Sequence, residues 1–113
     1  NLVDNALPME LYLKKGLAYL EEKHPIITNT RCIGLLAAFE LYEDPINGKK
    51  FGEKVFPANA VVEECFKRQL ILRALGAHNH IVAIAPPLII NKQEIEKMIG
   101  IIDEAIAACR KNF

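Results

Sequence analysis

The segment at residues 70–98 constrains the fold more than any other part of the chain. It holds two short apolar stretches, 71–75 and 80–85, which are separated by a turn that contains glycine. Strands this close in sequence are expected to pair antiparallel, because a parallel pair needs a connection of a dozen or more residues. A double proline then stops the pairing. Asn91, with Glu94 three residues later, predicts a capping box at the start of the last helix.

One charged residue, Arg73, stands inside the first of these apolar strands. Burying an unpaired charge is costly, so Arg73 in such a strand needs an anionic partner. Its planar guanidinium suits a carboxylate, which it can bind through two parallel hydrogen bonds. The residues by themselves leave two alternatives open for Arg73: a structural ion pair, or the binding of an anionic ligand. Arg31, which lies between two other predicted strands, is expected to form a structural salt bridge.

Apolar periodicity predicts the first helix at residues 6–23. Leu13, Leu17 and Leu20 recur at helical spacing on one face. Gly16 lies inside this helix at a cost in helix stability, which indicates that another element packs closely against it.

The middle of the chain predicts two strands and a second helix. The strands are expected at 26–30 and 33–42, and the longer one is apolar on both faces at its start, which is typical of a central strand. The helix is expected at 58–69, with Val62 and Phe66 on its buried side. The last helix carries one continuous apolar stripe, made of Ile95, Met98, Ile99, Ile102, Ala105, Ile106 and Cys109.

The predicted order is helix, strand, strand, helix, strand, strand, helix. This order favours an α+β layer, with a small antiparallel or mixed sheet of three or four strands and helices packed on one face. At 113 residues the chain is long enough for one domain with its own core.

Charge and cysteine usage exclude several classes of protein. Fourteen basic and fourteen acidic residues cancel, so no long-range field favours nucleic acid or an anionic membrane. The longest apolar run is about half the length of a membrane span. Three widely spaced cysteines predict buried thiols and a reducing compartment, so we expect a cytoplasmic protein.

The chain contains no complete catalytic set. His78 and His80 could in principle hold a metal, but no second ligand pair has matching spacing, so solvated turn histidines are the better interpretation. Every lysine stands in a polar or charged run, whereas a Schiff-base lysine is usually desolvated. We therefore assign no catalytic, cofactor-binding or metal-binding residue within the chain.

The same segments nevertheless resemble a known family, the class III pyridoxal-phosphate aminotransferases of fold type I. The resemblance covers essentially the whole chain and is to the C-terminal end of ω-transaminases and 4-aminobutyrate aminotransferases. It is carried by LILRALG at 70–76, HIV at 80–82, APPLII at 85–90 and EIE at 94–96, and upstream by NLV at 1–3, KHPII at 23–27, TRCIGL at 30–35 and FEL at 39–41.

The resemblance implies that residues 1–113 are the C-terminal small domain of an aminotransferase whose large, cofactor-binding domain is absent. The full-length enzyme would be a homodimer that uses pyridoxal 5'-phosphate to move an amino group from an amine or amino acid to a 2-oxo acid such as pyruvate or 2-oxoglutarate. Arg73 matches the family's substrate-carboxylate arginine, which swings aside for amines that lack a carboxylate. The chain alone would be inactive.

Two alternatives remain: another pyridoxal-phosphate reaction on this scaffold, such as an aminomutase, or a stand-alone ligand-binding or interaction module. The sequence also departs from the family pattern at two places. Cys32 stands where most members have glycine, and the turn at 76–81 is longer than usual. That longer turn places two histidines and an asparagine beside Arg73.

Overall fold

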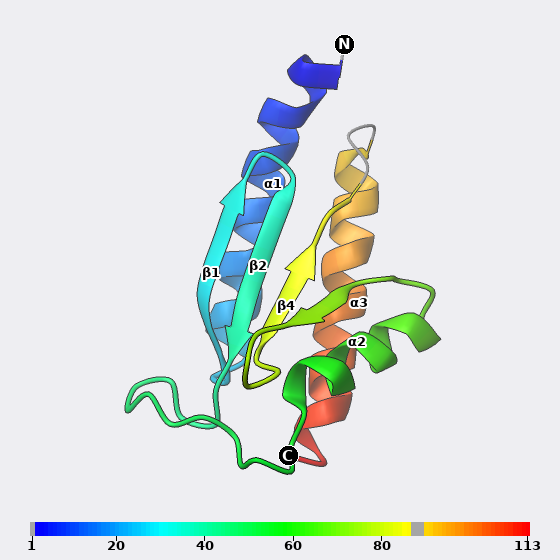
Figure 1. Cartoon of the computed structure of the whole chain (residues 1–113). Helices are drawn as coiled ribbons and strands as arrows, with labels where there is room; N and C mark the ends of the chain where they lie inside the picture. The colour runs from blue at the N-terminus through cyan, green and yellow to red at the C-terminus, as the bar shows by residue number, and fades with distance from the viewer. Residues whose placement is uncertain (1, 87–89) are drawn as a thin grey trace.

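The computed structural model describes residues 2–86 and 90–113. Seven elements follow one another in the predicted order (Figure 1). They are α1 (Leu2–Lys23), β1 (Ile27–Ile33), β2 (Leu36–Leu41), α2 (Pro57–Lys67), β3 (Arg73–Leu75), β4 (Ile81–Ile84) and α3 (Lys92–Arg110). The second residue of the double proline, at position 87, lies outside the described residues, so its expected effect on strand pairing stays a prediction.

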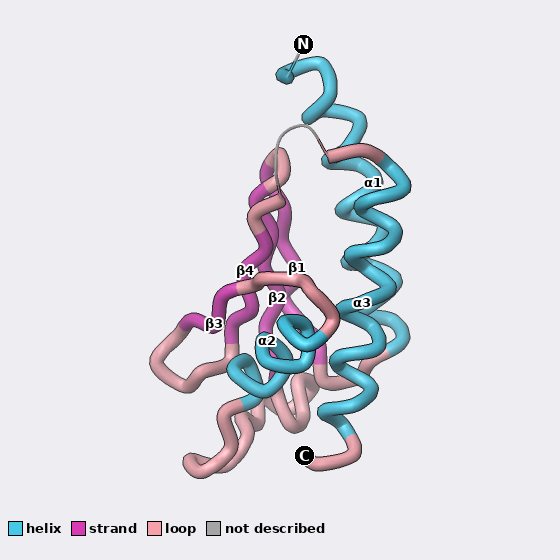
Figure 2. The backbone as a smooth tube through the Cα atoms, turned by 90° about the vertical axis from the view of Figure 1, so that its right-hand side faces the viewer, coloured by secondary structure: helices cyan, strands magenta, loops and turns pink. Residues whose placement is uncertain are grey.

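The four strands form one sheet in the order β1-β2-β4-β3, and every neighbouring pair is antiparallel. The expected antiparallel pairing of β3 with β4 is therefore confirmed, as is the interior position of β2. Helices α1 and α3 lie together on one side of the sheet (Figure 2), and α2 packs against α3 and β3. The α+β layer predicted from the sequence is confirmed.

One face of the sheet, here called the inner face, meets the helices. Phe39 of β2 lies opposite Val82 of β4, and Ala37 lies opposite Ile84; all four side chains are buried. The stripe on α3 meets this face, and all seven of its predicted members are buried, as the periodicity of 3.6 residues requires. Asn91 and Glu94 form the predicted capping box at the start of α3.

Helices α1 and α3 are joined by a close contact and by a cluster of charges. The contact is at Gly16, where a Cβ would come within 2.5 Å of Ile99 Cγ1, which confirms that the glycine marks a packing site. The charged side chains of Asp103 and Arg110 contact the buried His24 ring from its two nitrogens. His24 Nε2 lies 2.7 Å from Asp103 Oδ1, and Arg110 Nη1 lies 3.3 Å from His24 Nδ1. Because a guanidinium can only donate, Nδ1 accepts and the Nε2 hydrogen is donated to Asp103.

The expected strand at 33–42 is wrong in its first part. A tight turn at Gly34 and Leu35 divides it, and β1 extends to Ile33 instead. Gly34 has a φ of 60°, which glycine adopts without a steric penalty, so the turn forms there. Arg31 consequently lies within β1 and not between two strands.

The prediction of which side of α2 is buried is also wrong. Its buried residues are Pro57, Ala58, Val61 and Cys65, whereas Phe66 is 66% exposed. The two sets differ by one position along the helix, which is a rotation of about 100°. In a helix this short, apolar residues on adjacent faces make the side that meets the core ambiguous in the sequence.

Candidate functional site

The outer face of the sheet, which points away from the helices, carries both arginines of interest. In the strand register, Arg73 lies opposite Ala83, Ala83 lies opposite Ala38, and Ala38 lies opposite Arg31. Directly opposed residues of antiparallel strands share a face, and Val82, next to Ala83, points into the core. The four residues therefore form one row across the outer face, with an arginine at each end and two alanines between them.

Arg73 is exposed, so the expectation of a buried cation is wrong. Strand β3 is an edge strand of three residues, and the side chains of Arg73 and Leu75 are both exposed. Among the described residues, none forms a hydrogen bond or ion pair with the Arg73 guanidinium, whereas Arg31 at the other end of the row is paired. The sequence left two alternatives for Arg73, a structural ion pair and the binding of an anionic ligand. The described part of this chain offers no acidic partner for the first of them.

Arg31 forms the structural salt bridge that the sequence predicts. It lies 2.7 Å from Glu40 Oε2 and also donates to the carbonyl of Asn29. Burial would raise the pKa of Glu40, but the hydrogen bonds from Arg31 and Asn29 outweigh it, so the pKa lies below its ordinary value. Glu40 was not singled out as a partner from the sequence, although its outward position on β2 beside β1 could have indicated it.

The two histidines of the β3–β4 turn have different environments. His78 is exposed, as expected for a turn residue. The side chain of His80 is only 14% exposed; its ring meets the edge of Tyr42, and its Nε2 lies 3.7 Å from Glu40 Oε1. The expectation of a solvated histidine is therefore wrong for His80. Within residues 2–86 and 90–113, no three His, Cys, Asp or Glu side chains gather as a metal site would require.

The cysteines have raised pKa values, and none has formed a disulfide. Burial raises the pKa of Cys65 to about 12 and that of Cys109 to about 11, so both are the small buried residues that we expected. Cys32 is only partly buried. It lies in the extended strand β1, where a side chain causes no backbone strain. A cysteine at this position is therefore compatible with the local backbone.

The lysines do not fit a Schiff-base cofactor site. All ten are exposed in this structure, and such a lysine needs desolvation or a neighbouring cation to lower its pKa. None of these lysines is therefore desolvated by the described part of the chain in the way that a Schiff-base lysine requires. No helix among the described residues is long and apolar enough to cross a membrane.

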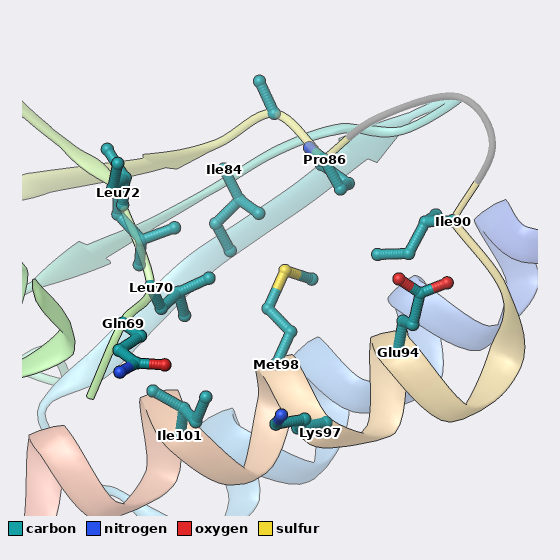
Figure 3. A pocket seen from close by; sticks show the side chains of 12 residues that line it. Gln69, Leu70, Leu72, Ile84, Pro86, Ile90, Glu94, Lys97, Met98 and Ile101 are labelled. Carbon is teal, nitrogen blue, oxygen red and sulfur yellow. The ribbon is translucent and has the colours of Figure 1, made fainter.

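An open hollow of about 320 Å³ lies between α3, the segment 69–72 that precedes β3, and the segment 84–86 at the end of β4 (Figure 3). Its walls are mainly apolar, including Met98, Ile84 and Leu72. Glu94 at its rim is already engaged in the capping box. The hollow belongs to the inner side of the sheet, on which Leu72 is buried, and it is separate from the row that carries Arg73.

The fold and the site together define a small α+β domain whose outer sheet face carries an exposed guanidinium, that of Arg73, with no partner among residues 2–86 and 90–113. Comparison with known proteins gives the family. The chain matches the family described as Aminotransferase class-III over residues 1–106. It is 30% identical over 117 residues to the taurine–pyruvate aminotransferase of Bilophila wadsworthia, covering 100% of this chain and 25% of that protein. The chain belongs to the class III aminotransferase family.

Two further relatives extend this result. The crystal structure of a transaminase from the marine bacterium Virgibacillus superposes with a TM-score of 0.92 at 32% identity, covering 98% of this chain and 25% of that one. The (R)-1-hydroxy-2-aminoethylphosphonate ammonia-lyase of Vibrio splendidus is 28% identical over 113 residues, which are all of this chain and 22% of that protein. The chain thus spans about a quarter of the length of its relatives.

Proposed function

We propose that this chain is the small domain of a pyridoxal-phosphate-dependent aminotransferase and that Arg73 binds the substrate carboxylate. The observation that carries the proposal is the contrast within one row of residues. Arg31 is held by Glu40, whereas Arg73 is exposed and has no side-chain partner among the described residues. A guanidinium in this state is available to an external carboxylate, which it can bind through two parallel hydrogen bonds.

The neighbours of Arg73 on the outer face suit this role. Ala83 lies directly opposite Arg73, and Ala38 follows on the next strand. Their methyl groups leave room for a substrate close to the sheet and offer no competing carboxylate. The carboxylate of Glu40 is the nearest acidic group in the register, one row further along β2, and it is already bound by Arg31.

The rest of the reaction needs parts that this chain does not contain. In the proposed enzyme, pyridoxal phosphate, when bound, supplies the electron sink through which an amino group moves from an amine or amino acid to a 2-oxo acid. Its lysine and phosphate-binding groups belong to the large domain. The proposal includes a homodimeric, cytoplasmic full-length protein, and the chain alone is expected to be inactive.

The large domain is also the expected cover for the outer face. Ile33 is 82% exposed and Leu36 is 67% exposed at the β1–β2 turn, and the matched relatives are about four times longer than this chain. An exposed apolar surface of this kind is typical of an interface. We therefore expect the isolated chain to self-associate at high concentration, which light scattering would detect.

A second candidate is another pyridoxal-phosphate reaction on the same scaffold. It is favoured by the relative named as an ammonia-lyase, which matches over the whole chain. Product analysis of the full-length enzyme separates the two. A transaminase consumes one molecule of 2-oxo acid for each amine, whereas a lyase releases ammonia without any 2-oxo acid acceptor.

The role of Arg73 is tested by Arg73→Ala in the full-length enzyme. Loss of two charge-assisted hydrogen bonds should lower kcat/KM for a carboxylate substrate roughly 10- to 100-fold. The value for an amine without a carboxylate should change only a few-fold. Arg31→Gln is the matched control, because it removes an arginine of the same row that is already paired. An equal loss for both substrate classes in Arg73→Ala would show that the arginine is structural.

A further inference from the structure

Helix α2 begins without a cap of its own. The residue before the helix, Phe56, makes no side-chain hydrogen bond to the first turn, although unsatisfied N–H groups at a helix start are usually capped locally. The partner comes instead from the turn between β3 and β4. The Ala58 N–H donates to the backbone carbonyl of Asn79 at 2.9 Å, and the Asn59 N–H donates to Asn79 Oδ1 at 2.8 Å.

The other end of α2 is bonded to the chain that enters β3. The Leu70 N–H donates to the carbonyl of Cys65 at 2.9 Å, and the next buried side chain is that of Leu72. Strand β3 is therefore fixed to α2 before it begins, at Leu70, and after it ends, at Asn79. Between these two ties lies Arg73, on a strand with a single neighbour in the sheet.

Helix α2, which makes the hydrogen bonds at both ends of β3, is itself well packed. Val61 and Cys65 are completely buried, and the helix packs against α3 as well as β3. An edge strand of three residues has few hydrogen bonds of its own to hold its position. The placement of the Arg73 backbone thus depends on α2 as much as on the sheet.

The conformation of Asn79 restricts which residues can make the cap. Its φ is 50°, in the left-handed region that glycine adopts freely and that asparagine and aspartate tolerate best among the others. Its N–H also closes the turn by donating to the carbonyl of Gly76. Glycine would satisfy the backbone but would lose the Oδ1 acceptor, and aspartate would keep both.

We propose that Asn79 is a positioning residue, which holds the β3–β4 turn against α2 and so sets the place of Arg73. The proposal rests on the proposed role of Arg73. It gives the turn between β3 and β4 a role, because this turn brings Asn79 to the first turn of α2. A residue of this kind acts through Arg73, so its loss should weaken the binding of carboxylates and leave simple amines unaffected.

The test uses the full-length enzyme with Asn79→Gly, Asn79→Ala and Asn79→Asp. We expect KM for the 2-oxo acid to rise roughly 3- to 10-fold in Asn79→Gly, with little change in kcat, because a small displacement of a binding group weakens its contacts. Asn79→Ala should likewise raise KM without changing kcat, and it should also lower the stability of the protein. Asn79→Asp should restore KM close to the wild-type value. Asn59→Ala is the matched control, because only the backbone N–H of Asn59 takes part in the cap.

The outcomes separate this proposal from the one on which it rests. Hydrogen exchange at the amide of Asn59 reports the cap directly and should be faster in Asn79→Gly than in wild type. An unchanged KM despite faster exchange, or an equal effect on carboxylates and simple amines, would overturn the role of Asn79. If Arg73→Ala itself fails to discriminate between these substrates, the proposed function fails first. If Asn79→Gly does not fold, the comparison of Asn79→Asp with Asn79→Ala decides the matter.

Discussion

The two faces of the sheet are built from alternate residues of the same strands but have opposite environments. On β2, Phe39 and Leu41 of the inner face are fully buried. Leu36, at the start of the same strand, points outward and is 67% exposed. All three are large and apolar. Hydrophobicity therefore does not distinguish the face that the helices cover from the face that this chain leaves open.

Charged groups show the same contrast. On the helix side, Asp103 is bonded to His24 and Lys23, and Arg110 donates to the other nitrogen of His24. On the outer face Arg31 is paired, but Arg73 has no such partner among the residues that the structure describes. On the helix side these polar groups are bonded to one another, whereas on the outer face Arg73 is exposed and has no such partner in the described part of the chain. Three pairs of substitutions, each with one packed or bonded position and one open position, test the contrast between covered and uncovered parts of the molecule.

The largest effect is expected from Phe39→Ala. Removing a fully buried phenylalanine should lower the free energy of unfolding by about 3–5 kcal/mol, because it loses buried area and leaves a cavity. Leu36→Ala on the outer face should stay within about 0.5 kcal/mol, since its side chain already contacts water. Urea denaturation of the two variants measures both. Equal costs would mean that the outer face is covered, for example by self-association.

A smaller effect is expected from Asp103→Ala, at about 1–3 kcal/mol, because it removes hydrogen bonds between charged and buried groups. Burial raises the pKa of Asp103, but the bonds from Lys23 and His24 prevail and the pKa lies below its ordinary value of 3.8. The stabilisation by Asp103 is therefore complete above pH 3.8 and is lost as the pH falls through the lowered pKa.

The matched variant on the outer face is Arg31→Ala, which should cost no more than about 1 kcal/mol, because the Arg31 side chain is half exposed. Denaturation curves recorded between neutral pH and strong acid check both statements. The difference in stability between wild type and Asp103→Ala should be constant at neutral pH and shrink in acid. A difference that does not shrink in acid would contradict the assigned pKa direction.

The smallest effect is expected from the two helical glycines, and it should have opposite signs. Gly16→Ala places a methyl group within 2.5 Å of Ile99, so it should destabilise by about 1 kcal/mol after the gain in helix propensity is subtracted. Gly100→Ala meets nothing within 4 Å and should stabilise by about 0.5–1 kcal/mol. Thermal unfolding measures both, and the cost of Gly16→Ala should disappear in an Ile99→Ala background, which lacks the Cγ1 and Cδ1 atoms that the new methyl group meets. Stabilisation by Gly16→Ala alone would disprove the close contact.

Several features could be predicted from the sequence because their signals are local. The order of elements, the buried stripe of α3 and its capping box are confirmed, since each depends on residues within a few positions of one another. The break at Gly34 and the buried side of α2 were missed. In both places the hydrophobic pattern is compatible with two arrangements, and contacts between distant segments select one of them.

The site was predicted only in part. Arg73 and Arg31 were singled out as the two arginines of interest, and the salt bridge of Arg31 was expected. Its partner Glu40 became evident only from the strand register. Asn79 was noted only as part of an unusual turn, because its bond to Asn59 joins residues 20 positions apart. Such a bond has no local pattern in the sequence.

The sequence by itself determined the order of helices and strands, that the last helix has one continuous apolar face, and that an arginine interrupts the apolar segment at 70–75. These properties follow from side-chain periodicity and from backbone preferences of glycine, proline and asparagine. Only the tertiary structure decided which face of the sheet the helices cover and that β3 is an edge strand. It also decided that Arg73 is exposed, with no partner among the residues that the structure describes. The physical reason is that the environment of a side chain depends on which distant elements pack beside it, and this is settled only when all elements are placed together.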